Sequence, residues 1–355
     1  MEVTLVVIIN NTKAFVSNLL SSLNKIKCNQ IFLLNGMMDF KAIKMFESYQ
    51  RENTDVRIIK SEKLLRYPIA MNTLLHEVKT KYVFIMDSDI LTTNKDIMRI
   101  HQFMEDNLNY GAVQGLLLYP QTNTIQSSGH LFYEFYDHYG HYKSIMNNLK
   151  TPLPRQALSA GFAMYPMDIV KSLGAYDSFY MHTMSGVEFS TRIHLSGHNV
   201  CCLPTAKGYH FHSLFRKNIK NKPENGIGKY WSTYGRYIKD DLISEIRQNS
   251  LFKDFAEYDV VDCSTIYDFN KFLNLLDIKV SQTILKTTDL LDESIILHNV
   301  VPHSILKSKN KILWICTNFT QISNNHVFFS HENRINDYII DMSGNIIPVS
   351  KLIKS

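Results

Sequence analysis

Two carboxylates, Asp87 and Asp89, flank Ser88 and come directly after the apolar segment 82–86. In extended backbone, residues at positions i and i+2 point to the same side of the chain. Carboxylate and phosphate oxygens are the ligands that Mg²⁺ and Mn²⁺ prefer, and open α/β sheets bind their ligands beyond the carboxyl ends of strands. The pattern therefore predicts a site for a divalent ion and a nucleoside diphosphate. The alternative is a solvated loop with two acids.

The elements that must position these acids alternate between strand and helix. Apolar, β-branched runs predict buried strands, and apolar residues at helical spacing predict the helices between them. Such alternation indicates βαβ units and a Rossmann-like α/β sheet with helices on both faces. We expect strands at 3–9, 30–34, 56–59, 82–86, 111–119, 156–165 and 199–203, and helices at 12–23, 39–51, 67–80, 94–107, 167–173, 187–195 and 230–246.

The pattern changes toward the end of the chain, and we place a domain boundary near residue 250. Residues 1–250 are predicted to form the α/β domain, and residues 251–355 a smaller C-terminal α+β region. Strands are expected at 312–316, 326–330 and 338–341, with a hairpin turn at 342–345. Nothing in this region indicates whether it packs on the first domain, binds an acceptor or mediates assembly.

Composition excludes several classes of protein. The 38 Lys and Arg residues exceed the 33 Asp and Glu residues by five, which is too weak a positive charge to indicate nucleic-acid binding. No apolar run approaches the roughly 20 residues that span a bilayer, although the charge would allow peripheral contact with a membrane. The five cysteines form no CxxC pair. We therefore expect a cytoplasmic protein, with the inner face of the membrane as an alternative.

Several motifs occur together in the order found in one enzyme family. They are residues 6–11 (VVIINN), 67–72 followed by the strand and Asp87-Ser88-Asp89, 112–115 (AVQG) with 125–130 (IQSSGH), 159–164 (SAGFAM) with 174–177 (GAYD), and 203–206 (LPTA) with 209–213 (YHFHS). The ordered set resembles family 2-type glycosyltransferases of the GT-A fold, and the 112–130 part resembles their rhamnosyltransferase-like branch. The resemblance covers roughly residues 3–240.

The resemblance implies a role for several residues. Asp89 would bind Mn²⁺ or Mg²⁺, Asp87 would contact the metal or the ribose, and His210 would be a third metal ligand. The alternative for His210 is a satisfied histidine at a strand end, and for the cationic residues it is a solvated surface. The implied contacts to the nucleotide-sugar come from Ile9, Asn11, Asn35, Asp39, Arg66, Asn72, Asp87, Ser88 and Lys217, of which Lys217 belongs to a basic loop that could close over the diphosphate.

Two departures from the family pattern matter. The loop 34–39 differs from the family's usual base-reading loop, so the nucleoside stays open, with UDP- and dTDP-sugars as the expected donors. The family's catalytic base lies in a Glu-Asp pair ahead of an Arg, and alignment on Arg192 puts that pair on Ser185 and Gly186. Glu188 is the acid nearby and is predicted to be the base. The alternatives are a structural Glu188, an acceptor that needs no strong base, or an impaired enzyme.

The resemblance implies a metal-dependent glycosyltransferase of glycan or polysaccharide biosynthesis. It would move a hexosyl or deoxyhexosyl group from a nucleotide-sugar to a hydroxyl of a glycan, lipid-linked or protein acceptor, with inversion. The alternative is a catalytically impaired GT-A protein that binds carbohydrate or a partner. A nucleotidyltransferase is disfavoured, because residues 10–13 contain no glycine for a phosphate loop.

Overall fold

The computed structural model describes residues 2–10, 15–36, 39–121, 123, 125–133, 136–139, 151–180, 184–211, 226–239, 241, 259–263, 283–286, 311–316, 337–341 and 346–348. The chain divides into two compact units. The first consists of Met1–Leu131 and Asn148–Ile238, and the second of Phe132–Asn147 and Lys239–Ser355. The predicted boundary near residue 250 lies outside the described residues and stays a prediction.

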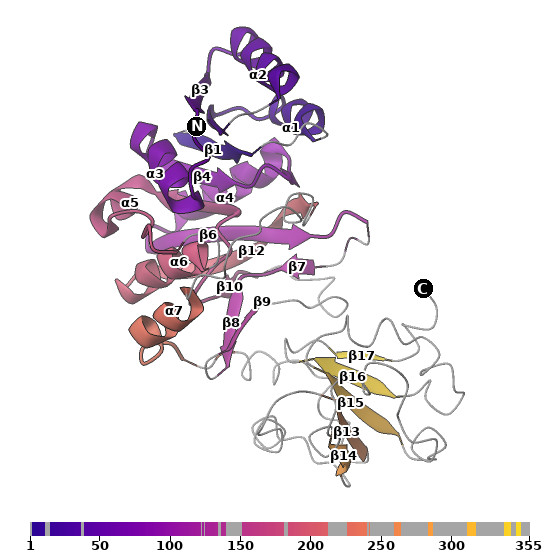
Figure 1. Ribbon diagram of the computed structural model, residues 1–355. Helices are drawn as coiled ribbons and strands as arrows, with labels where there is room; N and C mark the ends of the chain where they lie inside the picture. Colours follow the sequence, from indigo (N-terminus) through magenta and orange to yellow (C-terminus); the bar gives the residue numbers. More distant parts are fainter. Residues whose placement is uncertain are drawn as a thin grey trace. The chain divides into compact units, whose positions relative to one another are not determined.

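A mixed ten-stranded sheet forms the centre of the first unit (Figure 1). The main path runs β10-β12-β6-β11-β4-β1-β2-β3, with β5 paired to β12 and β7 paired to β6. Its strands are β1 (Val3–Ile9), β2 (Asn29–Asn35), β3 (Val56–Ser61), β4 (Tyr82–Met86), β5 (Ile90–Leu91), β6 (Tyr110–Leu118), β7 (Ile125–Ser127), β10 (Leu153–Pro154), β11 (Phe162–Pro166) and β12 (Asn199–His210).

The order of the strands contains a topological switch point between β1 and β4. Strands β1, β2 and β3 follow one another outward in parallel, whereas β4 lies on the other side of β1, also parallel to it. Beyond β4, strand β11 runs antiparallel to both β4 and β6. Ligands of open α/β sheets bind beyond the carboxyl ends of the strands at such a point, so the fold places the ends of β1 and β4 at its binding edge.

Helices cover both faces of this sheet, as predicted. The alternating residues of β1 explain why, because Val3, Leu5 and Val7 join one buried cluster and Val6 and Ile8 join another. Helices α1 (Val16–Leu23), α2 (Phe40–Glu52) and α4 (Asn94–Asp106) contribute to the first cluster. Helices α3 (Tyr67–Glu77), α5 (Met167–Leu173) and α6 (Ser185–Leu195) contribute to the second. The last helix of the unit is α7 (Gly226–Tyr234).

Most predicted elements are confirmed, and the differences lie in their lengths. Strand β11 begins at Phe162 rather than at 156, and strand β12 continues to His210 instead of ending at 203. A register shift between Leu203 and Lys207 marks a bulge in β12, and that interruption explains the early end in the sequence pattern. Helix α7 covers 226–234 rather than 230–246. Residues 12–14 and the predicted strand 326–330 lie outside the described residues.

The second unit contains a five-stranded sheet in the order β14-β13-β15-β16-β17 (Figure 1). Its strands are β13 (Asp259–Cys263), β14 (Thr283–Lys286), β15 (Ile312–Cys316), β16 (Tyr338–Asp341) and β17 (Ile346–Pro348). The first four pair in parallel and β17 pairs antiparallel to β16. The predicted hairpin turn at 342–345 lies outside the described residues. Buried Asp337 accepts hydrogen bonds from the Ile312 amide and the Trp314 indole at 2.9 and 2.7 Å. Strands β8 (His130–Tyr133) and β9 (Tyr136–Tyr139) form a separate pair.

Candidate metal and nucleotide site

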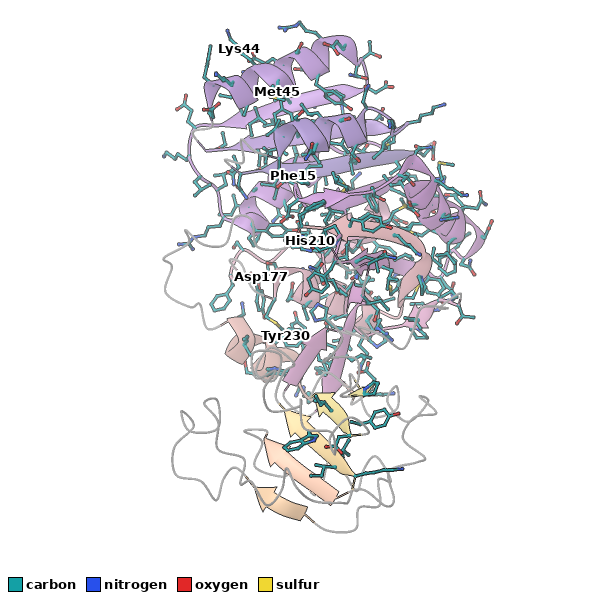
Figure 2. All side chains as sticks on the ribbon, turned by 90° about the vertical axis from the view of Figure 1, so that its right-hand side faces the viewer. Phe15, Lys44, Met45, Asp177, His210 and Tyr230 are labelled. Atoms are coloured by element: carbon teal, nitrogen blue, oxygen red, sulfur yellow. The ribbon has the colours of Figure 1, made fainter. Side chains whose placement is uncertain are left out.

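The strand pairing brings Asp87, Asp89 and His210 together at the carboxyl end of β4. The short strand β5, directly after the two acids, pairs with the end of β12 and sets His210 opposite Ile90. The Phe211 amide donates to the Asp89 carbonyl at 2.9 Å, which fastens the end of β12 to the acidic turn. The Phe211 ring in turn packs on Phe15, which is labelled with His210 in Figure 2, with centroids 5.0 Å apart.

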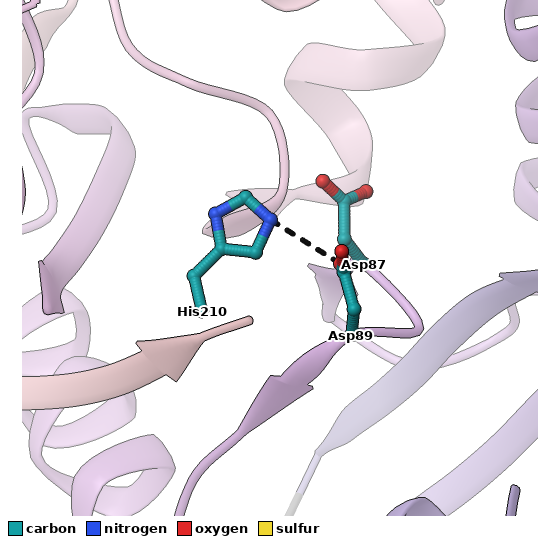
Figure 3. Close-up of side chains that lie close together, drawn as sticks. All are labelled: Asp87, Asp89 and His210. Atoms are coloured by element: carbon teal, nitrogen blue, oxygen red, sulfur yellow. Dashed lines mark ion pairs between the residues drawn. The ribbon is translucent and has the colours of Figure 1, made fainter. Parts of the chain in front are cut away.

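The three side chains converge closely enough to share one cation. One potential ligand atom from each lies within 4.8 Å of the other two. His210 Nε2 is 3.2 Å from Asp89 Oδ1, and the imidazole faces both carboxylates (Figure 3). Two carboxylates and an imidazole are donors that suit Mn²⁺, and carboxylate oxygens suit Mg²⁺. The residues present therefore fit a divalent ion.

Asp87 is held by contact with the backbone of Gly161. Its amide donates to the Gly161 carbonyl at 2.8 Å, and a Cβ atom on Gly161 would lie 2.3 Å from Asp87 Oδ2. The absence of a side chain at Gly161 is thus a requirement of this turn. Residue 161 was quoted within a motif but not predicted as a site residue, because its importance depends on a contact with a residue 74 positions away.

Three tyrosines pack beneath the acidic turn. Burial raises the pKa of Tyr67 and of Tyr165, and the nearby charge of Asp87 raises both further. Tyr176 is also buried, with its pKa raised by desolvation and by the other two tyrosines. These phenols remain neutral at physiological pH, so the negative charge of this region belongs to the carboxylates.

Two residues predicted to contact the nucleotide have structural hydrogen bonds. The Asn35 amide nitrogen donates to Asn10 Oδ1 and to the Leu65 carbonyl, each at 2.9 Å, and Asn35 Oδ1 accepts from the Leu65 amide at 2.8 Å. Asn72 holds the backbone of Tyr176 through two hydrogen bonds of 2.9 and 3.0 Å. Both amides therefore fix the loops around the binding edge.

The remaining predicted contacts occupy different positions. Ile9 is buried at the end of β1, at the switch point. Asp39 caps helix α2 by accepting from the amides of Lys41 and Ala42. Arg66 precedes helix α3 with an exposed side chain, and Ser88 is buried between the two acids. Asn11 and Lys217 lie outside the described residues.

The Glu188 carboxylate forms an ion pair with Arg192, one helical turn away. Its side chain is 1% exposed, and its two carboxylate oxygens lie 2.6 and 3.1 Å from the guanidinium nitrogens of Arg192. The Tyr234 hydroxyl donates to Glu188 Oε1 at 2.7 Å. Arg192 also donates to the carbonyls of Leu173 and Ala175. These contacts are typical of an ion pair that joins α6 to α7 and to the end of α5, and the base role of Glu188 stays a prediction.

The start of helix α6 packs tightly against the turn at Ala160 and Gly161 that precedes β11. A Cβ atom on Gly186 would lie 2.5 Å from the Ala160 Cβ and 2.6 Å from the Ala160 nitrogen. Position 186 is one of the two on which the family's acidic pair was predicted to fall. The packing explains why glycine is found there, since any side chain would collide with backbone.

Comparison with known proteins agrees with this geometry. Residues 4–174 match the model of glycosyl transferase family 2. Over this segment, which is just under half of the chain, the sequence is similar to glycosyl transferase family 2. No curated protein matches the sequence. The match to the family extends from β1 through the two acids to the end of α5, whereas His210 and α6 lie beyond it.

Solved structures are similar in fold. A crystal structure of GalNAc-T7 with UDP, GalNAc and Mn²⁺ matches with a TM-score of 0.52 at 12% identity, covering 78% of this chain and 55% of that one. This chain thus spans about half the length of that protein. A mannosyltransferase from Pyrobaculum calidifontis with GDP-Man and Mn²⁺ matches with a TM-score of 0.46 at 13% identity, covering 69% of this chain and 64% of that chain. Residues 1–349 of S. aureus TarS match with a TM-score of 0.47 at 11% identity, covering 93% of this chain and 80% of that one.

The family match and the likeness to GalNAc-T7 show the GT-A fold, and they do not show a rhamnosyltransferase. None of the helices in the described part of the chain has the length and apolar character needed to cross a bilayer.

Proposed function

We propose that the protein is a metal-dependent glycosyltransferase that moves a sugar from a nucleotide-sugar to an acceptor hydroxyl, with inversion. The observation that carries the proposal is the convergence of Asp87, Asp89 and His210 at the switch point of the sheet, next to a segment that matches glycosyl transferase family 2. The Mn²⁺ named with GalNAc-T7 supports a metal at this site. A uridine or thymidine diphosphate sugar is the proposed donor.

Different residues along the binding edge would bind the metal ion and the nucleoside. Asp89 and His210, which face each other at 3.2 Å, would hold the ion, and Asp87 would contact the ion or the ribose. The end of β1 at Ile9 and the adjoining loop would hold the nucleoside. A bound Mn²⁺ or Mg²⁺ would stabilise the negative charge that develops on the departing nucleoside diphosphate.

Removal of the proton from the acceptor hydroxyl is the step for which the described residues offer the weakest candidate. Inversion requires a group that removes this proton, and Glu188 is the predicted base. Its contacts with Arg192 and Tyr234 favour a structural role. That observation supports a second candidate function, a GT-A protein that binds a nucleotide-sugar or glycan without transferring it. Measurement of turnover separates the two.

The test is release of nucleoside diphosphate from a panel of nucleotide-sugars with Mn²⁺, with Mg²⁺ and with a chelator. We expect one donor to be hydrolysed slowly, with no release under chelation or in Asp89→Ala. Asp55→Ala is the matched control, because Asp55 is exposed and precedes β3 at the opposite edge of the sheet. Metal-dependent binding without release, even with glycan, lipid-linked and peptide acceptors added, would favour the binding protein. Absence of binding to every donor would exclude the transferase, and absence of binding to every donor and every glycan would exclude both functions.

A further inference from the structure

A glutamine side chain lies behind the imidazole of His210. Gln126 Oε1 is 2.6 Å from His210 Nδ1, while the opposite ring nitrogen, Nε2, is 3.2 Å from Asp89 Oδ1. The imidazole is therefore held at both of its nitrogens, by an amide on one side and by the acidic turn on the other. Gln126 was quoted within a sequence motif but was given no role there.

The chemistry of a metal-bound imidazole fixes what Gln126 must do. A ring nitrogen binds a cation through its lone pair, so the other nitrogen must carry the proton. A hydrogen-bond acceptor next to that second nitrogen selects the tautomer and the orientation of the ring. With Nδ1–H donating to Gln126 Oε1, the lone pair of Nε2 is directed toward Asp89 and the proposed ion.

The position of Gln126 is specified by the fold. Strand β7 runs antiparallel to the end of β6, with Leu118 opposite Ile125 and Leu117 opposite Ser127. The Gln126 side chain is buried, and its amide lies close enough to the Tyr119 hydroxyl to oppose the rise that burial causes in the pKa of that phenol. Burial of an amide costs free energy, so a residue that serves only packing would be expected to be apolar. The carbonyl oxygen of the same amide contacts His210 Nδ1.

We propose that Gln126 is a positioning residue that holds His210 in the Nδ1–H tautomer, with Nε2 directed to the metal. The inference rests on the proposed metal site. Gln126 acts through His210, so it affects the affinity for the ion before any donor or acceptor is bound.

The test uses the full chain and measures binding of Mn²⁺ alone by electron paramagnetic resonance, without turnover. Gln126→Leu removes the acceptor at similar size and should weaken Mn²⁺ binding about 10- to 100-fold, the usual range for the loss of such a partner. Gln126→Glu keeps an oxygen at this place and should bind within a few-fold of wild type. Gln102→Leu is the matched control, because Gln102 is exposed on α4 and bonded to Asp106.

A second readout reports the tautomer itself. In ¹⁵N spectra of the imidazoles, we expect His210 to show a protonated Nδ1 in wild type and in Gln126→Glu. In Gln126→Leu the Nε2–H form should appear. A merely structural role for Gln126 would change the melting temperature without changing this pattern.

The outcomes separate the two proposals. If wild type and Asp89→Ala bind Mn²⁺ equally, the metal site is wrong and the inference is overturned with it. If Asp89→Ala loses Mn²⁺ while Gln126→Leu binds as wild type does, the metal site stands and the role of Gln126 is wrong. Weak binding in Gln126→Leu with recovery in Gln126→Glu supports the inference.

Discussion

The Gly161 α-carbon and the Asp87 carboxylate are so close that a methyl group at position 161 would lie 2.3 Å from Asp87 Oδ2. Asp87 directly follows β4 and Gly161 directly precedes β11, two antiparallel neighbours, and the Asp87 amide donates to the Gly161 carbonyl. The Asp87 side chain therefore packs directly against the backbone of Gly161. This contact fixes the place of Asp87 relative to the start of β11.

Gly161→Ala should displace the Asp87 side chain and lower both stability and metal-dependent turnover. Forcing a methyl group into a packed site costs about 1–3 kcal/mol. Asp87→Ala removes the obstructing oxygen atoms, so the same Gly161→Ala change should cost less stability in that background. Urea unfolding of wild type, both single variants and the double variant gives the coupling energy. Additive effects would show that the two groups do not collide.

Glu188→Ala should destabilise the protein more than a surface change would. The variant leaves the Arg192 guanidinium beside Glu188 without its carboxylate in a largely buried place, and breaking a buried ion pair costs about 3–5 kcal/mol. The Arg192 side chain is 21% exposed, so we expect the lower end of that range, measured by urea unfolding. Glu77→Ala is the control, since its partner Arg57 has a side chain that is 54% exposed.

A second substitution at this position tests the predicted base role of Glu188. Glu188→Gln retains the size of the side chain and should keep donor hydrolysis when assayed well below its melting temperature. If Glu188 removes the acceptor's proton, transfer to the acceptor will fall far more than hydrolysis of the donor. An equal decline of both, in proportion to the folded fraction, would identify a structural residue.

Asn35→Asp should lower the stability of the protein, because it replaces a hydrogen-bond donor with an acceptor. The change replaces a donor nitrogen with an oxygen that faces two acceptors, Asn10 Oδ1 and the Leu65 carbonyl. Leaving buried polar groups unsatisfied costs about 1–3 kcal/mol. Because both N–H groups of the Asn35 amide are committed to these partners, we expect unfolding at lower urea and an unchanged preference among nucleotide-sugars. A changed preference would show that Asn35 reads the nucleoside.

The sequence was sufficient for the elements that carry the acids. The apolar run 82–86 lies between predicted helices and therefore predicts a buried strand that ends just before the two aspartates. Strand β4 has those bounds. Glu188 and Arg192 are four residues apart, a spacing that indicates an ion pair on one helix face, so their contact could have been predicted from sequence. The ion pair with Arg192 is the reason why the Glu188 carboxylate already has a partner in the structure.

Other features required the three-dimensional structure. Gln126 and His210 are 84 residues apart, and they meet because β7 folds back on β6 while β12 pairs with the other side of β6. No local pattern records that arrangement. The bulge in β12 likewise interrupts the strand signal at Pro204, and the end of the strand at His210 could not be recognised from periodicity alone.

The ion pair between Asp177 and Lys229 gives a prediction about pH. Burial acts to raise the pKa of Asp177, but the Phe179 amide and the Lys229 ammonium outweigh it and lower the pKa below its ordinary value of 3.8. A carboxyl group with a lowered pKa in the folded state stabilises the protein above the pKa of the unfolded chain. That contribution is lost as the pH falls through the folded pKa.

Wild type should therefore be more stable than Asp177→Asn at pH 6, and the difference should shrink below about pH 4. The side chains of Asp177 and Lys229 are 38% and 37% exposed, so the difference at pH 6 should be about 1 kcal/mol or less. Urea unfolding from pH 2.5 to 7 measures it. Lys229→Met in the Asp177→Asn background is the control, because it removes the cation whose partner is already neutral and should leave the remaining pH profile unchanged. A difference that stays constant down to pH 2.5 would show that Asp177 acts through the Phe179 hydrogen bond and packing rather than through its charge.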